Sequence, residues 1–165
     1  MLQQKVVIIM GSKRDLDFAS SISRVLEDYA VDYEFNVASA HRTPEHLLKI
    51  LKGYEGSGDN IVYITVAGLS DALSGLVAGF TKYPVIACPP DAEKYGWPKV
   101  FSSAMTPEGV AVSLVPKPEN AALAAVKILA LANPPLYERI TQHKQEREGA
   151  VVKANKELKG RKTSD

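Results

Sequence analysis

Cysteine is almost missing from this chain, which has Cys88 as its single thiol among 165 residues. One cysteine excludes an internal disulfide and is typical of a reducing compartment such as the cytosol. Because Cys88 ends the apolar run VIAC, we expect it to be a small buried hydrophobic residue. The three histidines and the scattered acidic residues lack the spacing of metal ligands, so we expect no metal site.

Neither sign of charge is in excess, since 20 Lys and Arg accompany 19 Asp and Glu. A balanced chain without a basic stripe predicts no nucleic acid and no membrane surface as a partner. The chain also has no apolar stretch of membrane-spanning length, and residues 1–5 lead directly into a strand pattern rather than a signal peptide. We therefore expect a soluble, cytoplasmic protein with a single domain over residues 1–165.

Short apolar runs alternate with segments of helical spacing, which predicts an α/β fold. The helical spacing covers residues 19–29 and 47–54, and the strands are expected at 5–10, 33–38, 61–66, 84–88 and 110–115. We predict a three-layer α/β/α sandwich with a flavodoxin-like, doubly wound parallel sheet in the order 2-1-3-4-5. Ligands of such folds bind beyond the carboxyl ends of the strands, so the loops there are the candidate site.

The C-terminal part of the chain has helical patterns of two kinds. Residues 118–132 are apolar almost all round, which predicts a helix buried on two sides and packed against other copies in a symmetric oligomer. With this helix the core spans about residues 5–132. A helical tail with few apolar anchors follows at about residues 134–160.

The loop after the first strand can bind an anion. Its glycine permits a tight turn, and the Ser12 hydroxyl and the backbone amides of the next helix can donate hydrogen bonds. Ser12 and Asp15 are also common helix caps, so plain capping is the alternative interpretation. The loop fits neither the dinucleotide GxGxxG pattern nor the GxxxxGKS phosphate loop, which disfavours both enzyme classes.

The loop after the second strand has the sequence SAHRTP and carries more chemistry. His41 can act as a general acid or base near neutral pH, and Arg42 can pair with a phosphate or carboxylate group. The alternative is a solvated loop. After the third strand, Gly68 lets a ligand approach the backbone and Ser70 offers a hydroxyl, unless Ser70 or Asp71 is only a helix cap. No GxSxG elbow supports a serine nucleophile.

These loops together resemble the PurE family over roughly residues 5 to 132. The resemblance rests on five ordered segments, IIMGSKRDLDFA, VASAHRTPEH, YITVAGLSDALSG, YPVIACPP and the Glu-Asn-Ala helix near residue 119. One branch of this family rearranges N5-carboxyaminoimidazole ribonucleotide and typically has a histidine in the third loop. That histidine is missing here, so the chain resembles the other branch, which carboxylates 5-aminoimidazole ribonucleotide (AIR) reversibly with CO2. The enzymes of that branch are carboxy-lyases of purine biosynthesis.

The resemblance implies a role for each matching residue. It implies His41 as the catalytic residue and the following substrate-binding residues: Ser12, Asp15, Ser39, Arg42, Gly68 and Ser70. It also implies AIR and CO2 as substrates, 4-carboxy-5-aminoimidazole ribonucleotide (CAIR) as product, no cofactor, neither ATP nor biotin, and a homo-octamer. His41 would take the proton that leaves the ring carbon after this carbon has attacked CO2.

The chain departs from the CO2-using branch at several positions. That branch usually has Lys at position 42, Arg at Leu69, Asn at Asp71 and an SSLRMPSG-like run where this chain has the residues around Met105. Two positive charges are thus missing near the expected site, and Arg42 resembles the mutase branch. The mutase reaction and a nucleotide-binding oligomer without catalysis therefore remain the alternative hypotheses.

Overall fold

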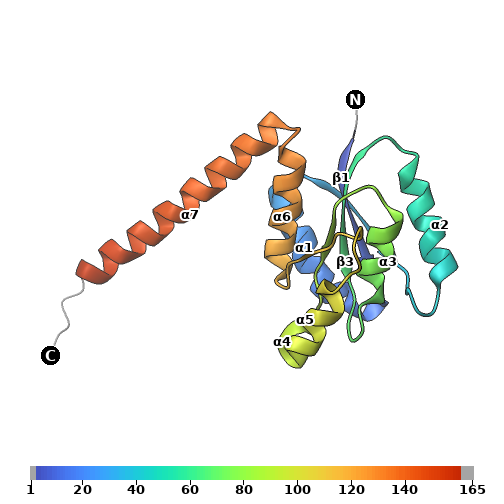
Figure 1. The fold of residues 1–165 in the computed structure, drawn as a ribbon. Helices are drawn as coiled ribbons and strands as arrows, with labels where there is room; N and C mark the ends of the chain where they lie inside the picture. Colours follow the sequence, from blue (N-terminus) through green and yellow to red (C-terminus); the bar gives the residue numbers. More distant parts are fainter. Residues whose placement is uncertain (1–2, 161–165) are drawn as a thin grey trace.

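The protein is described by a computed structural model that covers residues 3–160 (Figure 1). Five parallel strands form one sheet in the order β2-β1-β3-β4-β5, which confirms the predicted flavodoxin-like order. The strands are β1 (Gln4–Met10), β2 (Asp32–Val37), β3 (Asn60–Val66), β4 (Val85–Ala87) and β5 (Ser113–Leu114). Residues 1–2 and 161–165 of the predicted domain lie outside the described residues.

Helices cover both faces of the sheet, as a parallel sheet requires. They are α1 (Leu16–Asp28), α2 (Pro44–Glu55), α3 (Ala72–Phe80), α4 (Ala92–Tyr95), α5 (Trp97–Ala104), α6 (Pro118–Ala130) and α7 (Pro134–Gly160), with a short 3-10 turn η1 (Lys13–Asp15) before α1. Figure 1 shows α4 and α5 at the carboxyl end of the sheet, apart from the two covering layers.

The alternation of side chains along β1 divides the core into two halves. Val6 and Ile8 face a cluster built with α1 and α6, whereas Val7 and Ile9 face a cluster built with α2 and α3. All four side chains are fully buried, which is why the run reads as continuously apolar. Cys88 is buried on the α6 side, as expected from its apolar neighbours.

The local signals of the sequence fit the observed helix boundaries. Pro44 occupies the first turn of α2, where its fixed φ and missing N–H are tolerated, and Gly56 caps the other end. The fifth strand, expected over residues 110–115, has only two residues, because its neighbour β4 has three residues with which to pair. The expectation was thus right in position and too long at both ends.

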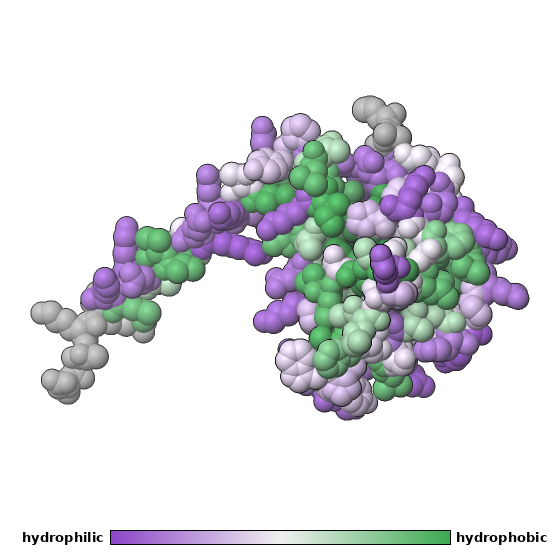
Figure 2. Space-filling model, viewed as in Figure 1, coloured by the Kyte–Doolittle hydropathy of each residue, from purple (hydrophilic) through white to green (hydrophobic). Residues whose placement is uncertain are grey.

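The two C-terminal helices differ in their surroundings. Helix α6 packs mainly on α1, with further contacts to β3 and α7, so much of its all-round apolar surface is covered within the chain. Helix α7 projects away from the rest of the molecule, and Figure 2 shows hydrophobic surface on the projecting part. Val151, Val152 and Leu158 are exposed there. None of the described helices has the length and apolar character to cross a membrane.

Candidate functional site

A pocket of about 590 Å³ lies where β1, β2 and β3 end. Each of these strands continues into one of the three loops that the sequence marks as candidates. The pocket is lined by Gly11, Ser12, Arg14, Asp15, Ser39, Ala40, His41, Arg42, Ala67, Gly68, Leu69, Ser70 and Leu73. All the predicted site residues are therefore brought together, although they come from segments up to 58 positions apart, from Ser12 to Ser70.

The first loop leads into the pocket through η1. Ser12 caps this turn, because its Oγ accepts the Arg14 N–H at 3.3 Å, so the capping interpretation of Ser12 holds. A hydroxyl that accepts one hydrogen bond still has a proton to donate to a ligand. Asp15 makes no capping bond with its side chain, and partial burial, with the nearby Asp91 charge, raises the pKa of its carboxyl.

The second loop is tied to the first by Arg42. The Arg42 guanidinium donates to the Gly11 carbonyl at 3.3 Å and to Ser39 Oγ at 3.5 Å. Ser39 Oγ also accepts the Arg42 N–H at 3.2 Å, which fixes the turn around the arginine. His41 lies between these two residues and is exposed in the pocket lining. The loop thus presents a positive charge and an imidazole side by side.

The third loop contains an unusual backbone conformation. Leu69 has a φ of 57°, in the left-handed region that residues other than Gly, Asn and Asp seldom adopt. Gly68 precedes it, and a Cβ at this position would lie 3.3 Å from Asp91 Oδ2, a tight contact that would require the carboxylate to shift. Ser70 is exposed in the pocket, whereas Asp71 caps α3.

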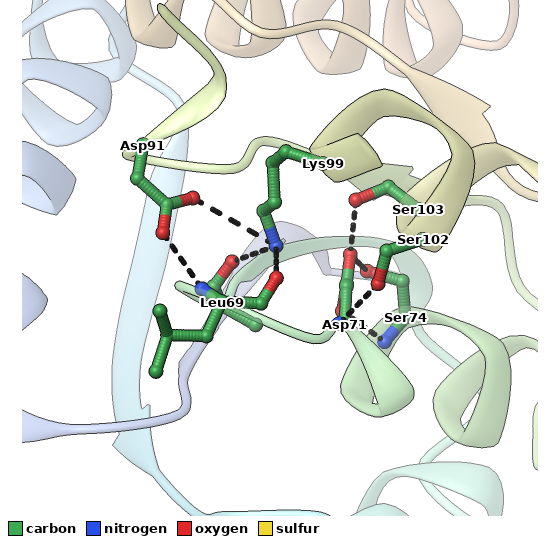
Figure 3. Close-up of polar contacts among 8 residues, drawn as sticks. Leu69, Asp71, Ser74, Asp91, Lys99, Ser102 and Ser103 are labelled. Carbon is green, nitrogen blue, oxygen red and sulfur yellow. Dashed lines mark hydrogen bonds and ion pairs between the residues drawn. The ribbon is translucent and has the colours of Figure 1, made fainter. Parts of the chain in front are cut away.

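Side chains of helix α5 reach the third loop, as Figure 3 shows. Asp71 accepts a hydrogen bond from Ser103 Oγ at 2.7 Å, and the Asp71 N–H donates to Ser102 Oγ at 2.6 Å. Lys99, one turn earlier on α5, is 2% exposed and donates to two carbonyls of the loop. Sequence reasoning missed Lys99, because nothing in its local pattern distinguishes it from a surface lysine.

The chemistry of the pocket is that of an acid–base and anion-binding site. His41 can exchange a proton, and the cations Arg14 and Arg42 line the same pocket beside the hydroxyls of Ser12 and Ser70. Arg14 is a second residue that the sequence reasoning did not select. Among residues 3–160 there is no group of three or more His, Cys, Asp or Glu side chains placed to hold a metal ion.

The chain is similar to proteins of one family over nearly its whole length. A family model described as AIR carboxylase matches residues 5–150. A phosphoribosylaminoimidazole carboxylase of Archaeoglobus fulgidus is 46% identical over 94% of this chain and 85% of its own. An N5-carboxyaminoimidazole ribonucleotide mutase of Methanocaldococcus jannaschii is 36% identical over 93% of this chain and 97% of its own. The crystal structure of Treponema denticola PurE superimposes on this chain with a TM-score of 0.91 at 35% sequence identity. The superposition covers 95% of this chain and 99% of the Treponema chain.

Proposed function

Because the chain belongs to the AIR carboxylase family, we propose that it carboxylates AIR reversibly with CO2 to CAIR in purine biosynthesis, as an ATP- and biotin-independent carboxy-lyase. The observation that carries the proposal is the pocket itself. It gathers one exposed histidine, two arginines and several hydroxyls at the carboxyl end of the sheet. The same end of a doubly wound sheet is where ligands of this architecture bind.

The proposed roles are those that the family resemblance implies for each loop, and the position of these residues in one pocket supports them. Ser12 and Asp15 bind the ribonucleotide from the first loop, and Ser39 and Arg42 bind it from the second. Gly68 and Ser70 complete the set from the third loop. The Arg42 guanidinium suits a phosphate because it is already held in place by the Gly11 carbonyl and retains further N–H donors.

His41 is the proposed catalytic residue. The nucleophilic ring carbon of AIR forms a bond to the carbon of CO2, and the electron pair of one C=O bond moves to oxygen to give a carboxylate. The same ring carbon then loses its proton to the His41 imidazole, which restores the aromatic ring. In the reverse direction the imidazolium returns the proton before CO2 departs. The protein's further contribution is to hold the two reactants together in the pocket.

The mutase reaction is the second candidate, and two observations favour it. Arg42 matches the mutase branch rather than the carboxylase branch, and a relative of comparable similarity is named as a mutase. Against it stands the third loop, where this chain has Ser70 and Asp71 and no histidine. The carboxylase remains our first proposal, because the third loop of this chain lacks the histidine that the mutase branch typically has there, and a histidine can transfer a proton.

We further propose that the enzyme acts as a homo-oligomer in the cytoplasm, an octamer by resemblance to its family. The projecting α7, with exposed Val151, Val152 and Leu158, supports association, because apolar side chains on an unpacked helix gain from burial against another copy. The lone buried Cys88 suits a reducing compartment.

The test is an assay without ATP of the wild type, His41→Asn and His46→Asn. The assay offers AIR with a bicarbonate/CO2 buffer in one series and N5-carboxyaminoimidazole ribonucleotide in the other. His46 is the matched control, since it is exposed on α2 and does not line the pocket. We expect the wild type and His46→Asn to convert AIR to CAIR and His41→Asn to lose roughly a hundredfold or more of kcat.

The other outcomes discriminate between the hypotheses. Turnover of N5-carboxyaminoimidazole ribonucleotide alone would replace the carboxylase by the mutase. Binding of AIR without turnover of either compound would leave a nucleotide-binding oligomer. Full activity of His41→Asn would remove His41 from the chemistry, whichever substrate is used.

A further inference from the structure

Lys99 is a buried lysine whose ammonium group donates two hydrogen bonds to the third loop of the pocket. Its Nζ donates to the Ala67 carbonyl and to the Leu69 carbonyl, each at 2.7 Å (Figure 3). The residue is 2% exposed and comes from α5, some 30 positions away in the sequence. The loop is therefore held by a charged group from a separate element rather than by its own turn chemistry.

Asp91 binds the same loop as a hydrogen-bond acceptor, with a charge opposite to that of Lys99. Its Oδ2 accepts the Leu69 N–H at 2.7 Å, and its Oδ1 lies 3.9 Å from Lys99 Nζ. Asp91 Oδ1 is buried and has no hydrogen-bond partner among the described residues, so the ion pair with Lys99 is its main compensation. The Lys99 ammonium thus binds two carbonyls of this short segment and the Asp91 carboxylate binds one of its amides, while the two charges attract each other.

The backbone shows why the loop needs such support. Leu69 has a φ of 57°, which is unfavourable for a leucine, and its side chain is 68% exposed and cannot anchor the loop. Asp91 binds the N–H of Leu69 and Lys99 binds its carbonyl, so both side chains contact the backbone of this residue. The left-handed turn is therefore maintained by the pair.

The pair also bears on function, because the loop it holds is a wall of the pocket. Gly68 and Ser70 line the pocket on either side of Leu69. Burying a lysine is costly: desolvation lowers the pKa of Lys99, and the charges of Asp71, Asp91 and Asp15 oppose that effect. An apolar residue would fill the space under the loop without this cost, but it would not bind the two carbonyls.

We propose that Lys99 and Asp91 are positioning residues that hold the left-handed turn at Leu69, so that Gly68 and Ser70 face the substrate in the geometry required for turnover. The catalytic part of this inference rests on the proposed function, whereas the structural part does not. Neither side chain lines the 590 Å³ pocket, so both position the loop rather than contact the substrate.

The experiment compares Lys99→Met, Asp91→Asn and the double variant with the wild type. Lys94→Met is the matched control, because Lys94 is exposed on the adjacent α4 and its Nζ lies 5.0 Å from the centre of the Tyr95 ring. Among the described residues, Lys94 forms no hydrogen bond or ion pair with residues 67–71. Hydrogen exchange is followed in a peptide covering residues 67–71 and in one covering β1. Kinetic constants kcat and KM for AIR are measured on the folded fraction, purified by gel filtration.

We expect exchange at the Leu69 amide to accelerate roughly tenfold or more in Lys99→Met while the β1 peptide stays protected. We expect kcat/KM to fall roughly 10- to 100-fold, a size typical of small misplacements in a site. The double variant should lose little more than Lys99→Met, because the two side chains belong to one support, and Asp91→Asn alone should lose less. Lys94→Met should match the wild type.

Unchanged exchange at residues 67–71 in both single variants would overturn the proposal, whether or not the wild type is active. Faster exchange with unchanged kcat and KM would overturn its catalytic part and leave a purely structural role. A wild type inert toward both ribonucleotides would refute the proposed function, and the exchange data would still decide what holds the loop. Asp91→Asn is the milder change, since an amide oxygen can still accept from Leu69, and it serves if Lys99→Met does not fold.

Discussion

Removal of the Asp71 carboxylate should destabilise the protein more than any exposed acidic substitution. Asp71 is 5% exposed, and its two oxygens accept hydrogen bonds from the Ser74 N–H at 3.0 Å, from Ser74 Oγ at 2.7 Å and from Ser103 Oγ at 2.7 Å. It therefore caps α3 and connects it to α5 at the same time. Replacement by alanine removes the cap and leaves buried hydroxyls without their acceptor.

The size of the effect follows from these contacts. Loss of a helix N-cap costs about 1 kcal/mol, and each buried hydrogen bond to a charged acceptor contributes about 1.5–3 kcal/mol. Ser74 Oγ retains a contact with Thr65 Oγ1 at 2.7 Å, which reduces the loss. We expect Asp71→Ala to lower the free energy of unfolding by about 3–5 kcal/mol. Asp71→Asn should cost only about 1–2 kcal/mol, because the amide oxygen still caps α3 and its NH2 can donate to Ser103.

Urea unfolding followed by circular dichroism measures these differences. All variants are compared at one protein concentration, because association between copies would make the midpoint depend on concentration. Asp28→Ala, at an exposed carboxylate on the last turn of α1, is the control and should stay within about 0.5 kcal/mol of the wild type. A loss below about 1 kcal/mol for Asp71→Ala would refute the view that this carboxylate joins α3 to α5.

Three further predictions concern other parts of the molecule. The raised pKa of Asp15 means that the folded state binds its proton more tightly than the unfolded state, so its contribution to stability falls as pH rises above the usual value of 3.8. Asp15→Asn should raise the urea midpoint at pH 7, with no difference well below pH 3.8, and should weaken substrate binding. Burial raises the pKa of Cys88 to about 12, so a thiol reagent at pH 8 should react only after unfolding. The combined Val151→Asp and Val152→Asp change should reduce the molar mass in light scattering, and an unchanged mass would remove α7 from the interface.

Much of the fold could be predicted from local patterns of apolar residues and from the residues that begin and end helices. The β1 run VVIIM is apolar on both faces, and each face meets a separate cluster of helices, so the sequence pattern directly predicts a parallel sheet covered twice. Pro44 and Gly56 mark α2 to the residue because their effects on the backbone are local. The length of β5 does not follow from its own residues, since pairing with the short β4 limits it.

The candidate site likewise has a part that the sequence predicts and a part that it does not. His41, Arg42 and Ser12 lie in the loops that follow strands, and parallel strands bring such loops to one edge, so the sequence identifies the pocket. The bond from Arg42 to the Gly11 carbonyl joins two loops 31 positions apart and has no local signature. Local patterns thus predict which residues meet, and tertiary contacts decide how each one is held.

Lys99 shows where inference from motifs reaches its limit. Judged by family resemblance, Leu69 replaces an arginine, which implies a loop that has lost a positive charge. The fold places the ammonium of Lys99 2.7 Å from the Leu69 carbonyl, so a cation does reach this loop, from α5. A contact between a distant side chain and the backbone of this loop cannot be seen by comparing one position with one motif. It requires the pairing of α5 with the turn after β3, which only the folded chain provides.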